Sequence, residues 1–311
     1  MIEHHQGEVC YLQFDLYQQF PEIIHGVFTR HGGHSPPPYE SLNVSWSGGD
    51  VLDNILPNRL LALRTLEIES YPCATLWQTH GADVAVFERD NWDDWRHDWG
   101  HRSYEVEGQE LIWTFKPRRK ADAIITRERG VTLALSFADC VPLVFYDPLQ
   151  KVLGMAHAGW RSTARGIAAA TVEAMSEQFG CKPHDIYVGI GPSIGPCCYE
   201  VSEQVQQLFQ GRADVPFIPP VTWGGATDWE PTRYTNLVRE SAVFSTLGPH
   251  LHLDLWKTNR NQLLMVGVLP EHIESPCICT SCHKDRFFSH RGEHGKTGRF
   301  PMIVALSEPE H

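Results

Sequence analysis

The sequence predicts a single domain of the α/β or α+β class, and two observations support this. Apolar runs of strand length alternate with segments of helical spacing along the 311 residues. No segment repeats at a fixed period, and no low-complexity linker divides the chain. With 42% hydrophobic and 21% charged residues, the chain can bury a sizeable core.

The first regular element that we expect is a helix over residues 53–68. Apolar side chains recur there near helical spacing, at Leu56, Leu60, Leu63 and Leu66. Asp53 stands in front of them, and aspartate is a favoured N-cap residue. We therefore predict that Asp53 caps this helix.

Three buried strands follow in the middle of the chain. Residues 130–140 and 141–148 are apolar runs of strand length, and a tight turn leads from the second run into a third at 152–159. Antiparallel strands that are joined by a turn return to the same edge of a sheet. Cys140 and His157 are therefore expected to meet at one edge.

Two strand–helix connections come next. Residues 161–180 are rich in alanine and predict a helix that begins directly after a strand and ends at Gly180. Residues 185–211 predict a strand, a glycine- and proline-containing loop, and a helix that begins near Ser202 and ends at Gly211. Loops that follow strand ends are where binding sites are usually built.

Residues 88–119 have a different character. Trp92, Trp95 and Trp99 are interleaved with charged residues and show no clear period. We expect a surface excursion from the domain, in which a loop packs its own tryptophans. A lid or a contact surface is the functional alternative.

Composition and charge exclude several classes of protein. The formal net charge is −12, which disfavours a general nucleic-acid binder or a binder of anionic membranes and favours a small or neutral substrate. No basic segment followed by an apolar run opens the chain, and no apolar stretch approaches the roughly 18 to 20 residues that span a bilayer. These features predict a soluble, cytoplasmic protein. The nine cysteines are odd in number, which favours reduced thiols over a disulfide framework.

The densest group of cysteines lies in the stretch "CICTSCH", with Cys277, Cys279 and Cys282 followed by His283. A structural zinc site needs four ligands, usually as two separated pairs. Cys279 and Cys282 form one acceptable pair, but the flanking residues crowd it, and no second pair lies nearby in the sequence. We therefore prefer buried cysteines that line a loop in front of a strand beginning at residues 285–290.

A more dispersed set of residues is a better candidate for a metal site. His80, Cys140 and His157 each interrupt or end an apolar run. A buried polar group without a partner costs about 1–3 kcal/mol, so each of these residues needs a partner. Alone, each is more often a satisfied core residue. Together, two imidazoles and one thiolate suit Zn²⁺ or copper and leave a fourth position open.

Other polar residues accompany these three. Asp139 adjoins Cys140, Arg30 precedes a glycine pair by one residue, and Arg161 follows "AHAGW". Ser193 lies in "GIGPSIG", whose backbone amides could hold an anion, although a tight turn explains this stretch equally well. The motifs G-x-S-x-G and H-E-x-x-H are absent, which disfavours the familiar hydrolase and zincin classes.

Eight motifs occur in a characteristic order: "FTRHGGHS" with "SLNVS", "QTHGADV", "ADAIIT", "ADCVPLVFYD", "AHAGWR", "IGPSIGPCCYEV", "NRNQL" and "FFSHRGEHGKTGRF". Through them the chain resembles the YfiH/laccase-domain family, also called the multicopper polyphenol oxidoreductase or purine nucleoside phosphorylase family, which includes the peptidoglycan editing factor. The resemblance implies a single-domain α/β sandwich of mixed sheets with flanking helices over residues 22–306. Residues 1–21 would then be an N-terminal extension, and 88–119 a tryptophan-rich insertion.

The resemblance also implies an activity. The metal-binding positions of the family fall on His80, Cys140 and His157, which would hold Zn²⁺, with copper as the alternative. The activity implied is phosphorolysis of adenosine, inosine and methylthioadenosine to the base and a pentose 1-phosphate, together with adenosine deamination. Purine nucleosides and phosphate are the expected small-molecule substrates, and no nucleic-acid or membrane partner is expected.

Further roles are expected for the polar residues around these three ligands. Asp139 would act beside the three ligands in catalysis. The residues expected to bind substrate are Arg30, Asn43, Arg161 and Ser193. Two positions depart from the usual family pattern, because Ser162 replaces a glycine and Gly292 replaces a basic residue. These departures affect the expected substrate preference and leave the three ligand positions intact.

Three alternative functions stay open at this point. Cys140 could be the nucleophile of a hydrolase of the peptidoglycan-editing type, with a histidine as base and Asp139 or another carboxylate to orient it. Copper-dependent oxidation of phenols is a second alternative, although a true laccase needs several copper centres built from many histidine pairs. A binding module that uses the tryptophan-rich insertion is the third.

Overall fold

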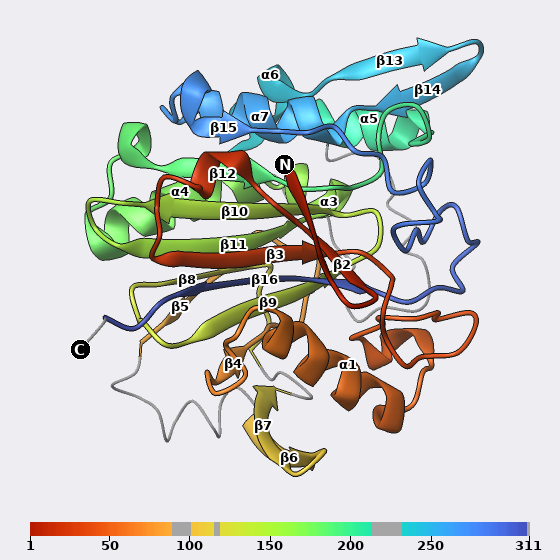
Figure 1. Cartoon of the computed structure of the whole chain (residues 1–311). Helices are drawn as coiled ribbons and strands as arrows, with labels where there is room; N and C mark the ends of the chain where they lie inside the picture. Colours follow the sequence, from red (N-terminus) through yellow and green to blue (C-terminus); the bar gives the residue numbers. More distant parts are fainter. Residues whose placement is uncertain (89–100, 115–118, 213–231, 310–311) are drawn as a thin grey trace.

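The protein is built from two mixed β-sheets that stack face to face, with helices on both outer faces (Figure 1). This computed structural model describes residues 1–88, 101–114, 119–212 and 232–309. The predicted class, an α/β sandwich of mixed sheets with flanking helices, is confirmed. Within the described residues, no helix is both long and apolar enough to cross a membrane.

The first sheet has eight strands, and it is antiparallel except where β4 pairs with β9 and β7. In spatial order the strands are β1 (Ile2–Gln6), β2 (Val9–Gln13), β3 (Ile23–Phe28), β16 (Phe300–Leu306), β9 (Thr132–Phe137), β4 (Cys73–Ala74), β7 (Gln109–Thr114) and β6 (His101–Val106).

The second sheet has six strands, and its outer pairs β15–β12 and β8–β5 are parallel. In spatial order they are β15 (Ile273–Glu274), β12 (Tyr187–Ile190), β10 (Val141–Asp147), β11 (Val152–Ala158), β8 (Ala123–Thr126) and β5 (Val84–Phe87). A separate antiparallel hairpin consists of β13 (Phe244–Leu247) and β14 (His250–Leu253).

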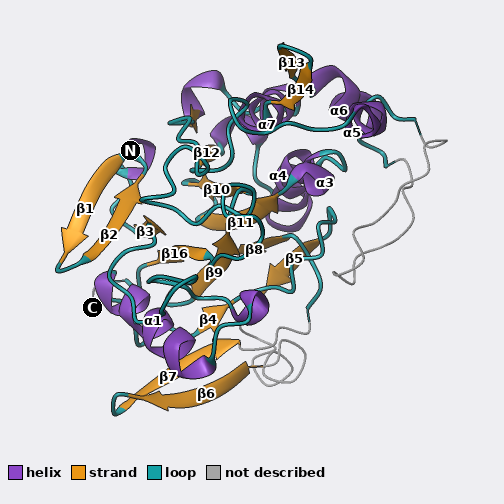
Figure 2. Cartoon of the chain, turned by 90° about the vertical axis from the view of Figure 1, so that its right-hand side faces the viewer, coloured by secondary structure: helices purple, strands orange, loops and turns teal. Residues whose placement is uncertain are grey.

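Helices cover the outer faces of the sandwich (Figures 1 and 2). Helix α1 (Leu52–Thr65) packs on the first sheet, and α4 (Ile167–Phe179) and α7 (Leu255–Met265) pack on the second. The shorter helices are α3 (Trp160–Thr163), α5 (Glu203–Phe209) and α6 (Thr235–Ser241), and 3-10 turns span Asp15–Tyr17, Trp46–Gly48, Pro183–Asp185 and Pro270–His272.

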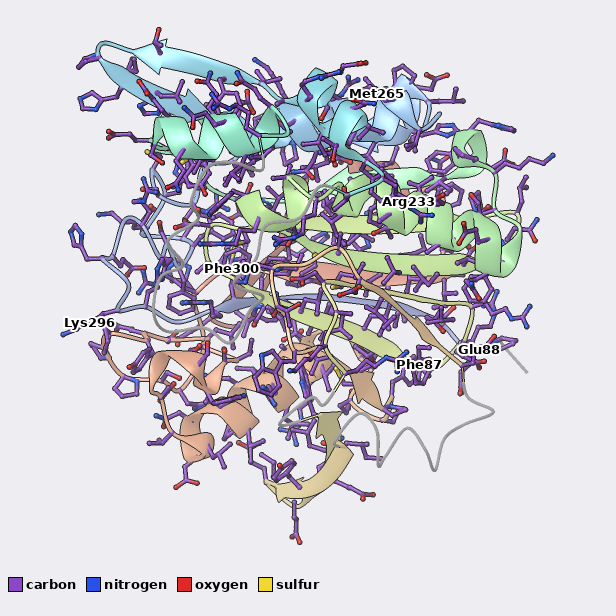
Figure 3. The ribbon with its side chains drawn as sticks, turned by 180° about the vertical axis from the view of Figure 1, so that it is seen from behind. Phe87, Glu88, Arg233, Met265, Lys296 and Phe300 are labelled. Atoms are coloured by element: carbon purple, nitrogen blue, oxygen red, sulfur yellow. The ribbon has the colours of Figure 1, made fainter. Side chains whose placement is uncertain are left out.

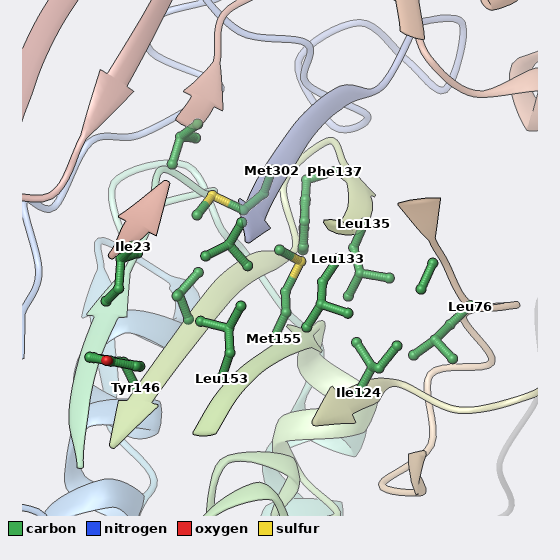
Figure 4. Close-up of a cluster of buried hydrophobic side chains, with 14 of the residues drawn as sticks. Ile23, Leu76, Ile124, Leu133, Leu135, Phe137, Tyr146, Leu153, Met155 and Met302 are labelled. Carbon is green, nitrogen blue, oxygen red and sulfur yellow. The ribbon is translucent and has the colours of Figure 1, made fainter. Parts of the chain in front are cut away.

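The core follows from the alternation of side chains along the strands. In β10, Val144 and Tyr146 point between the two sheets, whereas Leu143 and Phe145 point to the helices of the outer layer. Figure 4 shows the inter-sheet cluster around Tyr146. A strand that is buried on both faces has a continuous apolar run, which explains the sequence pattern of β10. Phe300 lies inside the molecule, whereas Met265 and Lys296 lie at its surface (Figure 3).

The hairpin of β10 and β11 confirms the expected meeting of two strand ends. Pro142 pairs with His157 and Val141 with Ala158, so Cys140 stands directly beyond the register at the end that carries His157. The tight turn joins the opposite ends of the two strands at Asp147 and Val152. This edge of the second sheet positions the candidate site.

The predicted N-cap of the first helix is wrong. Val51 is the N-cap of α1 and makes no side-chain capping hydrogen bond, and Asp53 lies in the first turn. A carboxylate in the first turn is still favourable there, because it faces the positive end of the helix dipole. The position of Asp53 therefore indicated the start of the helix, but Asp53 lies in the first turn and not at the N-cap.

The helix predicted over residues 161–180 is interrupted. Gly166 has a φ of 81° and separates α3 from α4, and a Cβ atom at this position would lie 2.6 Å from the Cβ of Tyr234. The close approach of Tyr234 therefore needs a glycine in a left-handed conformation. The end of the helix at Gly180, also left-handed, agrees with the prediction.

The described part of the tryptophan-rich segment is a hairpin and not a loop. Strands β6 and β7 pair at the edge of the first sheet, and Glu107 and Gly108 join them with φ values of 52° and 76°. Two successive positive φ values fit the type I′ turn that favours hairpins. Trp92, Trp95 and Trp99 lie outside the described residues.

The segment that we expected to be an N-terminal extension is joined to both sheets. Strands β1 and β2 continue the first sheet beyond β3. The buried hydroxyl of Tyr17 donates to the carbonyl oxygen of Val144 at 2.7 Å and accepts from the backbone N–H of Gly189 at 3.0 Å. One side chain thus connects the start of the chain to two strands of the second sheet.

We predict that Tyr17→Phe lowers the free energy of unfolding by about 1–3 kcal/mol, because a buried carbonyl and a buried N–H lose their partner. Urea denaturation measures this change. Tyr11→Phe is the control, because the Tyr11 hydroxyl makes no hydrogen bond within the described residues. Equal stability of both variants would show that Tyr17 does not link the sheets.

Candidate metal centre

Three sequence-predicted residues converge at the edge where β10 and β11 meet. His80 lies in the loop before β5, Cys140 lies just before β10, and His157 lies in β11. Their ligand atoms all lie within 4.8 Å of one another. The two imidazole rings are 4.9 Å apart between centroids and nearly perpendicular, so both can face a common point.

A buried carboxylate, Asp122, organises this group from behind. It accepts hydrogen bonds from the backbone N–H groups of Thr79, His80 and Gly81 at 3.1, 3.0 and 2.6 Å. The hydroxyl of Thr79 adds a bond at 2.9 Å, and Nδ1 of His157 lies 2.8 Å from the same carboxylate. Asp122 therefore fixes two of the three candidate ligands.

The backbone around the ligands is adapted to this arrangement. His80 has a φ of 61°, a left-handed conformation that is uncommon for a non-glycine residue and that turns its amide toward Asp122. A Cβ atom at Gly159 would lie 2.9 Å from Sγ of Cys140 and 3.2 Å from Cδ2 of His80. Only glycine leaves room for the two ligands to approach.

The electrostatics favour a charged thiolate. Burial would raise the pKa of Cys140, but the neighbouring His157 and His80 outweigh it and lower this pKa to about 6. Burial would likewise lower the pKa of His157, but the Cys140 thiolate and Asp122 raise it to about 10. Without a metal, the site therefore holds a thiolate beside an imidazolium.

The donor set fits a transition-metal ion. Thiolate and imidazole are ligands of zinc and copper, and three protein ligands leave a position open for a substrate or water. Because Asp122 engages Nδ1 of His157, Nε2 of this ring remains for a metal. A carboxylate that orients a ligating histidine in this way is a regular feature of metal sites.

Two arginines interact with the Cys140 thiolate. The guanidinium groups of Arg161 and Arg299 both interact electrostatically with Cys140. Burial lowers the pKa of Arg299, and the negative charges of Cys140, Asp139 and Glu293 oppose this shift. Arg161 was predicted from the sequence, whereas Arg299 was not.

Further residues of the site were also missed by the sequence argument. Arg165 donates from Nη1 to the carbonyl oxygen of His80 at 3.3 Å. His290 interacts electrostatically with His80 and Asp139. For Asp122 a signal existed, since a carboxylate directly before the buried strand "AIIT" must be satisfied, like the residues that we did select.

Asp139 holds loops together beside the ligands. Its φ is 85°, and its carboxylate accepts hydrogen bonds from the hydroxyls of Thr280 and Ser289, each at 2.7 Å, and from the backbone N–H of Arg291 at 2.6 Å. The carboxylate that orients His157 is therefore Asp122, and Asp139 connects the loops to Cys140.

Arg30 is engaged by the protein. Its guanidinium donates to the carbonyl oxygens of Glu40 and Lys284, each at 2.7 Å, and forms an ion pair with Glu293 at 2.9 Å. It also lies over the ring of Phe288. The structure thus places Arg30 in the scaffold of the loops and not among the groups that interact with Cys140.

Asn43 and Ser193 are buried and act on neighbouring residues. Oδ1 of Asn43 accepts from the backbone N–H of Arg299 at 2.9 Å, which positions that arginine. Oγ of Ser193 accepts from the indole N–H of Trp256 at 2.6 Å. Neither side chain is brought directly to the three candidate ligands by these contacts.

The interpretation of "CICTSCH" as lacking a second cysteine pair is wrong. The loop after β12 brings Cys197 and Cys198 to Cys279 and Cys282, and the four sulfur atoms all lie within 4.8 Å of one another. The expected strand at residues 285–290 is also absent, because these residues form turns and irregular chain. These four thiols therefore form a candidate metal site that is separate from His80, Cys140 and His157.

The geometry agrees with comparisons to known proteins. A sequence profile of the multi-copper polyphenol oxidoreductase laccase family matches residues 24–307. The chain belongs to this family. A purine nucleoside phosphorylase named YlmD from Geobacillus stearothermophilus is 36% identical over 93% of this chain and 92% of its own length. A purine nucleoside phosphorylase from Bacteroides thetaiotaomicron is 31% identical over 93% of both chains.

Solved structures show the same fold. The crystal structure of YlmD from Geobacillus stearothermophilus superposes with a TM-score of 0.76 and 32% identity, and the match covers 99% of each chain. The crystal structure of the hypothetical protein YfiH from Bacillus licheniformis gives a TM-score of 0.74 with 28% identity over 97% of each chain. The resemblance noted from the motifs is therefore confirmed along almost the whole chain.

We predict that Asp122→Asn weakens zinc binding by about 10- to 100-fold, because the residue that orients His157 loses its charge. Competition with a chromophoric chelator measures the affinity. Asp147→Asn is the matched control, because Asp147 is buried in the turn at the other end of the same hairpin. Unchanged zinc affinity in Asp122→Asn would contradict the role of this carboxylate.

Proposed function

We propose that this protein is a zinc-dependent purine nucleoside phosphorylase that acts on adenosine, inosine and methylthioadenosine, with adenosine deaminase activity beside it. The observation that carries the proposal is the convergence of His80, Cys140 and His157 in a chain that is 36% identical to a purine nucleoside phosphorylase over 93% of its length. Zn²⁺ is the metal that we assign to these ligands.

The proposed reaction breaks the bond between the purine and C1′ of the pentose while phosphate attacks C1′. Negative charge enters with phosphate and appears on the departing base. His80, Cys140 and His157 would hold Zn²⁺, which would supply Lewis-acid chemistry that also suits deamination. The work of the protein is to bind the anion, hold the sugar and stabilise the charge on the base.

The arginines of the site suit this task. The chain has a formal net charge of −12, yet Arg161, Arg165 and Arg299 gather around Cys140 and His80. A local positive field in an acidic protein attracts phosphate to one place. We propose that Arg161 and Arg299 bind phosphate, and that Asn43 fixes the backbone of Arg299 for this purpose.

The direct test incubates zinc-loaded protein with inosine in phosphate buffer. We expect equimolar hypoxanthine and ribose 1-phosphate, and no release of base without phosphate. Arg299→Ala should lower kcat/KM roughly 100-fold, since removing one donor from a charge-stabilising site has an effect of this order. Arg64→Ala, which removes a surface ion pair with Glu107 and hydrogen bonds to Gln109, should leave activity unchanged. Inert adenosine and inosine would refute the proposal.

Two related activities need separate assays. Release of ammonia from adenosine without phosphate tests the deaminase activity. Oxidation of a phenol by copper-loaded protein tests the oxidase alternative. Each reaction has its own product, so one can be present without the other.

A cysteine hydrolase is the second candidate, and one specific observation favours it. Cys140, His157 and Asp122 lie in a row in which the histidine interacts with the thiol and hydrogen-bonds to the carboxylate. This is the order of groups that activates a cysteine nucleophile. A metal on Cys140 would block the nucleophile, so metal occupancy separates the two candidates.

We predict that iodoacetamide alkylates Cys140 in metal-free protein with a midpoint near pH 6, because His157 and His80 overcome the effect of burial on this thiol. Below this pH the thiol is protonated and unreactive, and above it the thiolate reacts. Peptide mass spectrometry follows the residue. His157→Ala should raise the midpoint towards about 8.5. Rapid labelling of zinc-loaded, active protein would favour the hydrolase.

A further inference from the structure

A group of four thiols lies in two loops that both follow strands of the second sheet. Cys197 and Cys198 lie in the loop after β12, and Cys279 and Cys282 lie in the loop after β15. Sγ of Cys282 is 3.5 Å from Sγ of Cys197 and 3.4 Å from Sγ of Cys198. All four sulfur atoms lie within 4.8 Å of one another.

We propose that Cys197, Cys198, Cys279 and Cys282 bind a second Zn²⁺ ion, which has a structural role. In a tetrahedral site with zinc–sulfur bonds of about 2.3 Å, neighbouring sulfurs are roughly 3.8 Å apart. Two of the sulfur separations, 3.5 and 3.4 Å, are slightly shorter than that value, and none exceeds 4.8 Å. Four thiolates fill the coordination sphere, so the site has no position for a substrate.

The geometry distinguishes this site from other uses of four cysteines. The sulfur atoms all lie within 4.8 Å of one another, which suits the ligands of a single ion, whereas iron–sulfur clusters contain several metal and sulfide atoms and need a wider cage. The backbone N–H of Gly195 donates to Sγ of Cys279 at 3.2 Å. Such a bond stabilises negative charge on a sulfur, which suits a zinc-bound thiolate.

The site joins two loops that lie far apart in the sequence. The backbone N–H of Thr280 donates to the carbonyl oxygen of Ser193, and the N–H of Ser193 donates to that of Ile278, each at 3.1 Å. Among the described residues, these backbone bonds and the thiols connect the two loops around Cys279. A zinc ion would add a strong link at a place where two of the thiols are exposed.

The proposed second site is connected to the candidate metal centre through Thr280. Thr280 follows Cys279, and its hydroxyl donates to Asp139, the residue before Cys140. On the other loop, Tyr199 follows Cys198, and its ring lies 5.2 Å from the guanidinium carbon of Arg291. The second zinc ion would therefore hold the loops that position Asp139 and, through it, Cys140.

The test measures zinc in purified, reduced protein by mass spectrometry after dialysis against a weak chelator. We expect about two zinc equivalents in the wild type and about one in Cys282→Ser. Cys277→Ser is the matched control, because Cys277 lies in the same loop, is exposed and stands outside the cluster, so it should keep both. His80→Ala should keep only the second ion.

Cobalt substitution adds a spectroscopic measure that does not depend on activity. Co²⁺ in His80→Ala should show the intense thiolate-to-metal charge transfer of four sulfur ligands, and Cys282→Ser should lose most of it. Thermal unfolding should show a lower Tm for Cys282→Ser than for Cys277→Ser. A zinc content that Cys282→Ser does not lower, a disulfide among the four thiols, or copper in place of zinc would overturn the proposal. An inert enzyme with two bound zinc ions would refute only the proposed function.

Discussion

The arrangement of the candidate centre depends on one buried charge. The carboxylate of Asp122 is fully removed from solvent, and a buried carboxylate is tolerated only when donors satisfy it. The donors come from the loop at residues 79–81 and from His157. Because this one carboxylate needs several donors, it holds His80 and His157 together, although they lie 42 and 35 residues from Asp122 in the sequence.

The sandwich creates the place where this charge can act. Both faces of the second sheet are covered, so its polar groups concentrate where strands end and loops begin. Cys140 and His157 stand at one such edge, and the loops after β12 and β15 extend from the same sheet. The candidate ligands, the carboxylates that support them and the four further thiols therefore lie at strand ends of this sheet or in the loops connected to them.

The sequence predicted the parts that depend on local pattern. The alternation of buried strands and the turn between them placed Cys140 at the same sheet edge as His157, and the motifs indicated the family. What it did not predict depends on contacts across long stretches of chain. Cys197 and Cys282 are 85 residues apart, and Arg30 meets Glu293 across 263 residues. Neither neighbour is visible in a local pattern, so the sequence showed one cysteine pair without a second and gave no sign of the ion pair between Arg30 and Glu293.

The most direct test of the account is anomalous X-ray diffraction from crystals of zinc-loaded protein, with data collected on both sides of the zinc absorption edge. The account predicts one anomalous peak within bonding distance of His80 Nε2 or Nδ1, Cys140 Sγ and His157 Nε2, with Asp122 still bonded to Nδ1 of His157. Zinc bound elsewhere, with no peak among these three residues, would contradict it.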